Sequence, residues 1–301
     1  MALSNKGLVQ DRLCENRVVI ITGAGGGLGK AYAQMFAAEG AKVIVNDINE
    51  KAASDVVAEI VAAGGQAVAN TNDITDYEES AQIVKQAIDS FGDLHVVVNN
   101  AGVCRDRMFA SLSESDWDAV MNVHLKGHFC ISSNAVKYWR EQSKGGKEVS
   151  ARIINTSSGA GLQGSIGQSN YAAAKGGIAS LTLVQAAELA RYGITANGLA
   201  PAARTGMTED VFADMMKKPE DGFDFYAPEN VAPLVVWLGS EESKNVTGRL
   251  FEVEGGKISM ADGWRQGPLK DKGNRWEPAE IGDAVASLIE ESVPAQKVYG
   301  T

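Results

Sequence analysis

The chain has 301 residues, of which 45% are hydrophobic and 22% are charged. These fractions are typical of globular domains and exclude a disordered chain. The formal net charge is −10 and the sequence has no basic stripe, which argues against a nucleic-acid partner, because binding to a phosphate backbone needs clustered Lys and Arg.

The cysteines and the apolar runs indicate the compartment. Cys14, Cys104 and Cys130 are odd in number and form no Cys-x-x-Cys pattern, so we expect no disulfide framework. No apolar run approaches the roughly 18 residues that span a bilayer, and residues 1–17 lack the apolar segment of a signal peptide. We therefore predict a cytoplasmic protein without membrane contact.

Short apolar runs alternate with longer amphipathic stretches along the chain. Seven runs are predicted as buried strands, at residues 18–22, 42–46, 66–69, 94–99, 152–156, 195–199 and 249–253. Helices are predicted between them, at residues 30–39, 52–63, 77–91, 116–139 and 171–191. This alternation predicts an α/β fold of the Rossmann type, a doubly wound parallel sheet of seven strands in a single domain.

Two regions depart from that alternation. Residues 200–226 form a long connection rich in Met, Pro, Asp and Lys, which we interpret as a lid over a site. Residues 263–301 carry Gly, Pro and charge, and their pattern indicates no role. We therefore expect a catalytic domain at residues 8–262 and a C-terminal extension at residues 263–301.

A glycine-rich turn joins the first predicted strand to the first predicted helix. Residues 22–29 read Thr-Gly-Ala-Gly-Gly-Gly-Leu-Gly. Glycines permit a tight turn and let backbone N–H groups approach a pyrophosphate, which the positive end of the following helix also favours. The position between strand and helix favours this function over an ordinary turn, and we predict that Gly23, Gly27, Leu28 and Gly29 bind a dinucleotide.

Asp47 ends the second predicted strand, 24 residues after Gly23. An acidic side chain about 20 residues after the glycine turn reaches the adenine ribose of a dinucleotide. Its carboxylate would repel a 2′-phosphate, so we predict NAD rather than NADP. Lys30 and Lys51 lie near these residues in the sequence and could bind a 2′-phosphate, so NADP stays open as an alternative cofactor.

Tyr171 and Lys175 lie four residues apart on a predicted helix, and therefore on one face of it. A charge about 4 Å from the phenol contributes roughly 4 kcal/mol at a dielectric constant of 20, enough to lower a tyrosine pKa by up to about three units. Such a phenol suits acid–base catalysis. The spacing alone is also common in surface pairs, so the interpretation depends on the other motifs.

Three motifs together resemble the short-chain dehydrogenase/reductase family: the spacing Thr-Gly-x-x-x-Gly-x-Gly, the segment Asn-Asn-Ala-Gly at residues 99–102, and Ser158 placed 13 residues before Tyr171. The resemblance implies that Ser158 hydrogen-bonds the substrate oxygen and that Tyr171 gives or takes the hydroxyl proton. It also implies that Lys175 holds the nicotinamide ribose and lowers the tyrosine pKa, while Asn122 holds a water that connects Lys175 to solvent.

The cofactor contacts that we predict, from the motifs and this resemblance together, are Gly23, Gly27, Leu28, Gly29, Asp47, Asp73, Ile74, Asn100, Ala101, Gly102, Tyr171, Lys175, Pro201 and Thr205.

Within that family, the chain is similar over roughly residues 10–258 to the (3R)-hydroxyacyl-CoA dehydrogenase region of multifunctional β-oxidation enzymes. The similar stretches include residues 102–107, 115–118, 204–208 and 229–235. The resemblance implies a 3-hydroxyacyl thioester as the substrate, with a ring-bearing acyl group such as a sterol side chain among the candidates.

The chain also departs from that branch. Pro201-Ala202 replaces the common Pro-Gly, residues 219–226 differ, and the tail after Gly256 does not follow the branch closely. A 3-oxoacyl-[acyl-carrier-protein] reductase or a hydroxysteroid dehydrogenase therefore stays open. A dinucleotide sensor without catalysis is a further alternative, which the presence of all four catalytic residue types disfavours.

Other chemistry-bearing residues suit packing better than catalysis. His124 and His128 lie four apart, but with His95 as the only other histidine they suggest packing or a subunit contact rather than a metal site, and we predict no metal. Cys104 and Cys130 are interpreted as core or loop residues. Small residues at 172–177 allow close approach of helices, so we expect a homodimer or homotetramer.

Overall fold

The computed structural model describes residues 12–205, 216–261 and 263–301. Within these ranges eight strands form one sheet in the order β3-β2-β1-β4-β5-β6-β7-β8. The first seven pair in parallel and β8 pairs antiparallel with β7. The strands are β1 Val18–Thr22, β2 Lys42–Asn46, β3 Gln66–Asn70, β4 Val96–Asn99, β5 Ala151–Thr156, β6 Ile194–Ala202, β7 Leu250–Glu254 and β8 Lys257–Ala261.

The seven predicted parallel strands are confirmed, but the predicted count was one too low. The pattern missed β8, which follows β7 through the two-residue turn Gly255-Gly256. Gly255 has a φ of +53°, which suits the tight turn of a hairpin. The chain therefore reverses and Lys257 pairs with Glu254 at the sheet edge.

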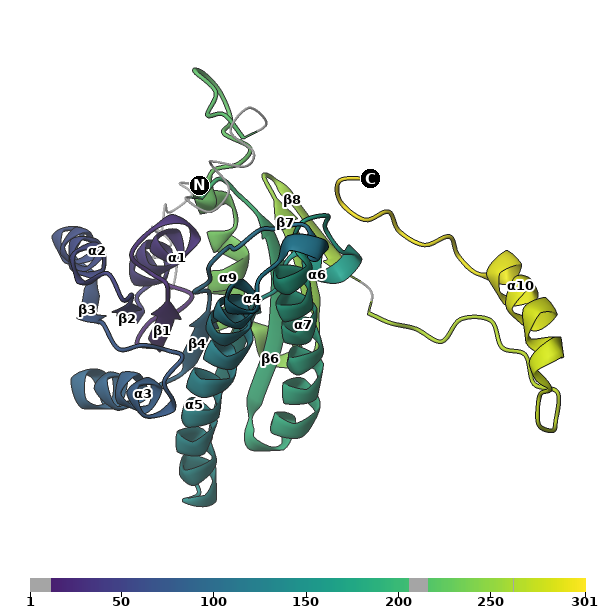
Figure 1. The fold of residues 1–301 in the computed structure, drawn as a ribbon. Helices are drawn as coiled ribbons and strands as arrows, with labels where there is room; N and C mark the ends of the chain where they lie inside the picture. The colour runs from purple at the N-terminus through teal and green to yellow at the C-terminus, as the bar shows by residue number, and fades with distance from the viewer. Residues whose placement is uncertain (1–11, 206–215, 262) are drawn as a thin grey trace, which may run out of the picture.

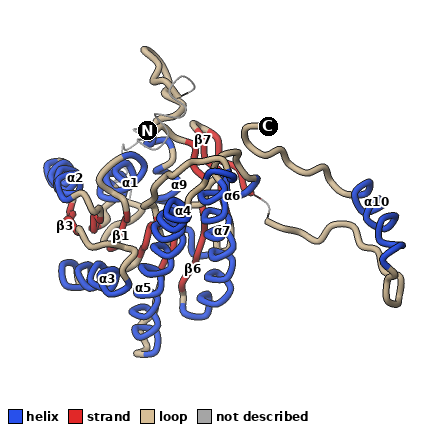
Figure 2. Tube along the Cα trace, in the orientation of Figure 1, coloured by secondary structure: helices blue, strands red, loops and turns tan. Residues whose placement is uncertain are grey.

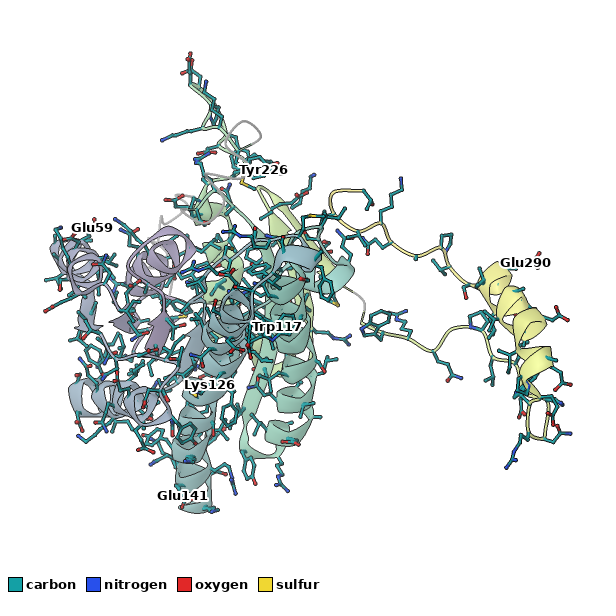
Figure 3. The ribbon with its side chains drawn as sticks, viewed as in Figure 1. Glu59, Trp117, Lys126, Glu141, Tyr226 and Glu290 are labelled. Atoms are coloured by element: carbon teal, nitrogen blue, oxygen red, sulfur yellow. The ribbon has the colours of Figure 1, made fainter. Side chains whose placement is uncertain are left out.

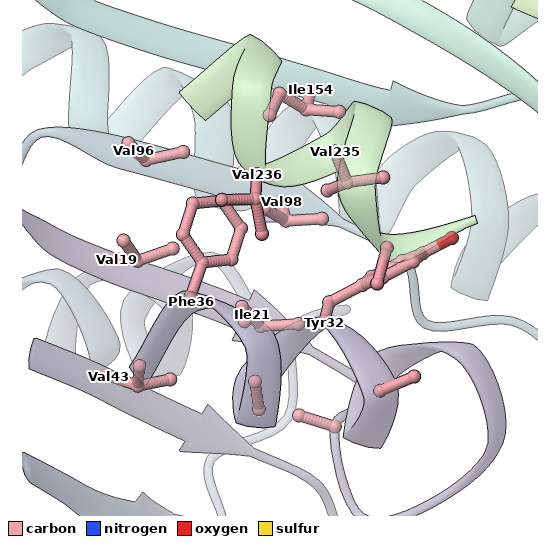
Figure 4. Close-up of a cluster of buried hydrophobic side chains, with 14 of the residues drawn as sticks. Val19, Ile21, Tyr32, Phe36, Val43, Val96, Val98, Ile154, Val235 and Val236 are labelled. Carbon is pink, nitrogen blue, oxygen red and sulfur yellow. The ribbon is translucent and has the colours of Figure 1, made fainter. Parts of the chain in front are cut away.

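Helices cover both faces of the sheet (Figure 1). They are α1 Gly27–Ala38, α2 Glu50–Ala62, α3 Tyr77–Phe91, α4 Glu114–Met121, α5 Gly127–Lys144, α6 Gly159–Gln163, α7 Ser169–Leu189, α9 Ala232–Gly239 and α10 Ile281–Glu291. Successive residues of a strand point to opposite faces, so Val19 and Ile21 pack with α1, α2 and α9, whereas Val18 and Ile20 pack with α3, α5 and α7. Figure 4 shows the first of these clusters.

The helix predicted at residues 116–139 consists of three parts. A π-helical turn, Asn122–Lys126, separates α4 from α5, and the Gly127 N–H bonds the Asn122 carbonyl five residues earlier. Such wide turns inside helices are frequent at functional sites. The spacing of apolar residues does not reveal such a turn, because one wide turn hardly changes which residues face the core.

The connection predicted as a lid is only partly described. Its first residues belong to β6, which extends to Ala202, because the backbone continues to pair with β7 there. Residues 206–215 lie outside the described residues. Arg204, before this range, forms an ion pair with Asp224, after it. The Arg204 backbone N–H also donates to the Tyr226 carbonyl at 2.7 Å.

The extension leaves the sheet after β8 and carries α10 away from the domain (Figures 1 and 2). α10 has no buried residue, and Glu290 marks its position among the drawn side chains in Figure 3. The last residues then return toward α6, where Tyr299 and Ser165 pair through their backbones in an isolated parallel β-bridge. Among the described residues, no helix is both long and apolar enough to cross a membrane.

Candidate active site

In the glycine-rich turn between β1 and α1, the backbone packs so closely that a side chain has no room at Gly29. A Cβ on Gly29 would lie 2.2 Å from the Gly23 carbonyl oxygen and 2.7 Å from the Asn100 Nδ2 atom. Asn100 Nδ2 donates to the carbonyls of Thr22 at 3.0 Å and Gly23 at 3.2 Å. The end of β4 therefore holds the glycine turn, and only glycine fits at position 29.

Thr22 makes a second link between these two strand ends, which the sequence interpretation did not assign. Its Oγ1 accepts from the N–H groups of Asn100 at 3.0 Å and Ala101 at 3.1 Å. Thr22 directly precedes the glycine turn in the sequence, and a hydroxyl-bearing residue at the end of a predicted buried strand was the signal that could have identified it.

The start of α1 suits a phosphate group. Gly26 precedes the helix without a side-chain cap, and the first turn contains no acidic residue. Free N–H groups and the positive end of the helix dipole then face any ligand at this end. A Cβ on Gly27 would lie 3.4 Å from the Thr205 methyl group, so Thr205 is brought to the same turn.

Asp47 is held against the glycine turn. Its Oδ2 accepts from the Gly25 N–H at 2.9 Å, and its Oδ1 accepts from the Asn49 N–H at 2.9 Å. A carboxylate oxygen has further lone pairs, so both atoms can still accept from a ribose hydroxyl. The donor set therefore fits an adenosine ribose beside the turn.

Asp73 and Ile74 follow the carboxyl end of β3, as the glycine turn follows that of β1 and Asp47 follows that of β2. Asp73 Oδ1 accepts from the Thr75 N–H at 2.8 Å, and the Asp73 N–H donates to Glu79 at 2.7 Å. Ile74 is buried, and its Cδ1 would lie 2.8 Å from a Cβ on Gly127. Crevices at the carboxyl ends of strands, where the strand order reverses, are where such sheets bind ligands.

Ser158, Tyr171 and Lys175 come together from two elements. Ser158 ends the segment after β5 and caps α6, its Oγ accepting from the Ala160 N–H at 3.2 Å. Tyr171 lies in the first turn of α7, and Ser158 is near enough to its hydroxyl to lower the pKa of the phenol. The Lys175 Nζ lies 5.5 Å from the centroid of the Tyr171 ring.

Lys175 is almost fully buried, and its Nζ donates to the Thr156 carbonyl at 2.6 Å. Burial lowers the pKa of Lys175 to about 7, because a buried ammonium loses its hydration. The Ser157 Oγ donates to the Lys175 carbonyl at 2.8 Å, which ties α7 to the end of β5.

The expectation that Lys175 lowers the pKa of the Tyr171 phenol is corrected by the structure. Burial raises the pKa of Tyr171, and the nearby Ser158 hydroxyl offsets this rise only in part. Lys175 does not acidify the phenol here, since its Nζ is bonded to Thr156 and its charged form is itself destabilised by burial.

Asn122 begins the π-helical turn, and that turn packs against α7. A Cβ on Gly177 would lie 3.2 Å from a Leu125 side-chain carbon. Asn122 is half-buried. Of the other predicted cofactor contacts, Pro201 pairs with Val253 near the carboxyl end of β6, and Leu28 is partly buried in the first turn of α1.

His124 lies closer to this site than its sequence pattern indicated. Its ring meets the Tyr171 ring edge to face, with centroids 5.2 Å apart and planes at 89°. Its Nε2 lies 2.8 Å from the Val103 carbonyl oxygen, and burial lowers its pKa to about 3. The side chain is buried inside the chain, so it packs there as a neutral ring.

A Cβ on Gly102 would collide with that ring, at 2.2 Å from its Cε1. His124 therefore also shapes the Asn-Asn-Ala-Gly segment. In the described part of the chain no group of three or more His, Cys, Asp or Glu side chains could hold a metal ion.

Comparisons with known proteins agree with this geometry. A model of the short chain dehydrogenase family matches residues 17–216. Hydroxyacyl-CoA dehydrogenase ChsB1 of Mycobacterium tuberculosis is 41% identical over 293 residues, which cover 95% of this chain and 92% of that enzyme. Peroxisomal multifunctional enzyme type 2 of Mus musculus is 46% identical over 253 residues, which cover 81% of this chain and 32% of that longer enzyme.

A solved structure, a short chain dehydrogenase from Mycobacterium avium, superposes with a TM-score of 0.89 at 56% identity. The match covers 96% of this chain and 100% of that one.

Fold, site and relatives define the class of this protein as an oxidoreductase that acts on CH–OH groups. The chain belongs to the short chain dehydrogenase family, whose members generally bind NAD(P). The predicted resemblance to hydroxyacyl-CoA dehydrogenases is confirmed by the two relatives named above.

Proposed function

We propose that the protein is an NAD-dependent dehydrogenase that interconverts a 3-hydroxyacyl thioester of coenzyme A and its 3-oxoacyl form. The observation that carries the chemistry is the convergence of Ser158, Tyr171 and Lys175 at the end of β5. The substrate class is supported by the name of the relative that matches nearly the whole chain, a hydroxyacyl-CoA dehydrogenase.

The choice of NAD is supported by Asp47. Its carboxylate is hydrogen-bonded to the glycine turn and cannot easily move away, so a 2′-phosphate would meet a fixed negative charge. The residues that would hold the dinucleotide are those of the glycine turn together with Asp47, Asp73 and Asn100.

The cofactor, when bound, supplies the hydride acceptor or donor. Ser158 holds the substrate oxygen by a hydrogen bond. As the alcohol becomes a ketone, its proton passes to the Tyr171 oxygen, while the proton that the phenol already carries leaves along a relay to neutral Lys175. Lys175 would hold the nicotinamide ribose of the bound cofactor. Its low pKa suits a proton relay near neutral pH, in which Asn122 holds the water that connects Lys175 to solvent.

We further propose a homodimer or homotetramer that works in the cytoplasm. Ring-bearing acyl groups such as a sterol side chain are the substrates to compare first with straight chains.

Tyr171→Phe tests the chemistry. The variant keeps the ring against His124 but lacks the hydroxyl, so we expect kcat to fall by at least about 100-fold while the Kd for NAD changes less than about twofold. Steady-state kinetics and calorimetry measure the two quantities. Tyr192→Phe, on the turn after α7, is the matched control, and a Tyr171→Phe enzyme with most of its kcat would contradict the assignment.

A substrate panel tests the specificity. Matched 3-hydroxyacyl-CoA, 3-oxoacyl-carrier-protein and hydroxysteroid compounds are compared by kcat/KM, with the absorbance of the reduced cofactor as readout. We expect the thioesters of coenzyme A to be preferred by at least about tenfold. Turnover of none of them, with dinucleotide binding intact, would favour a sensor instead.

A further inference from the structure

The last four residues of the chain return to the segment that follows Ser158 (Figures 1 and 2). The Tyr299 carbonyl accepts from the Ile166 N–H at 3.0 Å, and the Tyr299 N–H donates to the Gly164 carbonyl at 3.2 Å. Ser165 and Tyr299 are thereby paired like neighbours in a parallel sheet. The C-terminus is thus bound through its backbone to the segment between α6 and α7.

The Tyr299 ring lies on Gly159, the residue directly after Ser158. A Cβ on Gly159 would lie 2.7 Å from the Tyr299 hydroxyl oxygen and 3.0 Å from the ring. Burial raises the pKa of Tyr299, and the nearby Gln163 side chain offsets this rise only in part. Position 159 therefore accommodates the ring because it has no side chain.

Two neighbouring contacts have the same form. Val298 side-chain carbons lie 3.4 Å from the Cβ position of Gly164, and the Ile166 side chain lies 3.4 Å from that of Gly300. Each contact pairs a glycine on one segment with a larger side chain on the other. The contacts are confined to these residues, and Ile166, Val298 and Tyr299 each stay more than a third exposed. The preceding helix α10 has no buried residue, so the C-terminus is held to the domain by this contact rather than by α10.

The segment that Tyr299 covers also touches the catalytic helix. A Cβ on Gly161, in α6, would lie 2.6 Å from the Lys175 backbone. α6 is therefore packed between the C-terminus and α7, and Ser158 caps its first turn. A shift of α6 would move Ser158 relative to Tyr171.

We propose that residues 298–301 are a part of the active site, in which Tyr299 is a positioning residue that holds α6 and with it Ser158. This inference rests on the proposed role of Ser158, and it assigns a function to the end of the extension. Tyr299 acts through Gly159 and the backbone of residues 164–166, so its ring matters more than its hydroxyl.

Hydrogen exchange tests the contact without any substrate. A chain that ends at Lys297 is compared with the full chain, and exchange is followed in the peptide that contains Ile166. We expect exchange of the Ile166 amide to become at least about tenfold faster, because its acceptor is the Tyr299 carbonyl. Val293→Ala, at an exposed site of the extension, is the control and should leave the exchange unchanged. Equal exchange in the full and shortened chains would overturn the proposal.

Kinetics test the positioning role. Tyr299→Ala should lower kcat by about fivefold or more with an unchanged Kd for NAD, whereas Tyr299→Phe should stay within about twofold of the wild type. If Tyr299→Phe loses as much as Tyr299→Ala, the hydroxyl and not the ring is responsible, and the proposal fails. Unchanged thermal unfolding of both variants separates positioning from instability.

Gly159→Ala supplies a double-mutant cycle. Its methyl group would displace the Tyr299 ring, so it should lower kcat in the full chain but cause no further loss in the Tyr299→Ala background. Additive losses would show that position 159 acts independently of the C-terminus and would overturn the proposal. If no substrate is turned over, the proposed function fails, while the exchange experiment still decides whether the C-terminus holds this segment.

Discussion

Asp47 is the residue on which the choice of cofactor depends. Asp47→Asn removes the charge but keeps an oxygen that can accept from Gly25. We expect the ratio of kcat/KM for NAD to that for NADP to fall by at least about tenfold, because the repulsion of a 2′-phosphate is lost. Asp55→Asn changes an exposed carboxylate of α2 and should leave the ratio unchanged. An unchanged ratio in Asp47→Asn would place the discrimination elsewhere.

Lys175 makes a prediction about stability and pH. The folded protein binds a proton on Lys175 below about pH 7, whereas the unfolded chain binds it below the ordinary pKa of 10.5. Between these values the unfolded state holds the extra proton, so folding becomes less favourable as pH falls through this window. Lys175→Met lacks this dependence.

The Tm of Lys175→Met relative to the wild type should therefore rise as pH is lowered from about 10 to about 7.5, by at least about 2 °C. The pH dependence of the difference is the readout, since the lost hydrogen bond to Thr156 contributes equally at each pH. Differential scanning calorimetry measures it. A difference that is constant over the window would mean that the folded protein keeps Lys175 charged.

At the scale of elements, α1 and α9 approach closely over the sheet (Figure 4). Gly239 ends α9, and a Cβ there would lie 2.5 Å from the buried Phe36 ring and 3.6 Å from Val96. Both neighbouring side chains are fully buried, so neither can turn aside into solvent. The pair therefore shows how strongly the helix layer is packed on this face.

Gly239→Ala should lower the free energy of unfolding by about 1–3 kcal/mol, the usual cost of an extra methyl group in a packed core. Chemical denaturation measures this cost. Gly256→Ala, in the open turn before β8, is the control, because a Cβ there meets no atom of the described residues within 4 Å. Equal stability of the two variants would show that α9 moves away from α1 at no cost.

At the scale of the molecule, large apolar side chains stay exposed on two long helices. Phe129 on α5 and Leu183 and Val184 on α7 are each about half exposed. α7 also carries the small residues that led us to expect a subunit contact. Association of two or four copies would remove this apolar surface from water.

Light scattering should therefore give a molar mass of two or four times the 31.8 kDa of one chain. Leu183→Arg should lower that mass, because a charged side chain would be buried in the contact. Leu269→Arg, on the extension and also exposed, is the matched control. A wild-type protein that is monomeric at micromolar concentration would contradict the expected assembly.

Much of the fold could be predicted from local pattern. The seven parallel strands follow from short apolar runs, because a strand buried on both faces needs apolar residues at nearly every position. The edge strand β8 escaped prediction because most of its residues are exposed, so it has no such run. The extension escaped for a related reason, since α10 is amphipathic but buries none of its residues against the described part of the chain.

In the candidate site, too, some features follow from the sequence and others only from the folded structure. The sequence by itself determined which residues could do the chemistry, because the glycine turn, Asp47 and the Ser, Tyr and Lys spacing are local features of backbone and side chain. Their assembly was decided by tertiary structure alone: the raised pKa of Tyr171, the ring of His124 beside it and Tyr299 on Gly159 all depend on burial and on contacts between segments far apart in sequence. Desolvation and packing are properties of the folded interior, and no local pattern along the chain encodes them.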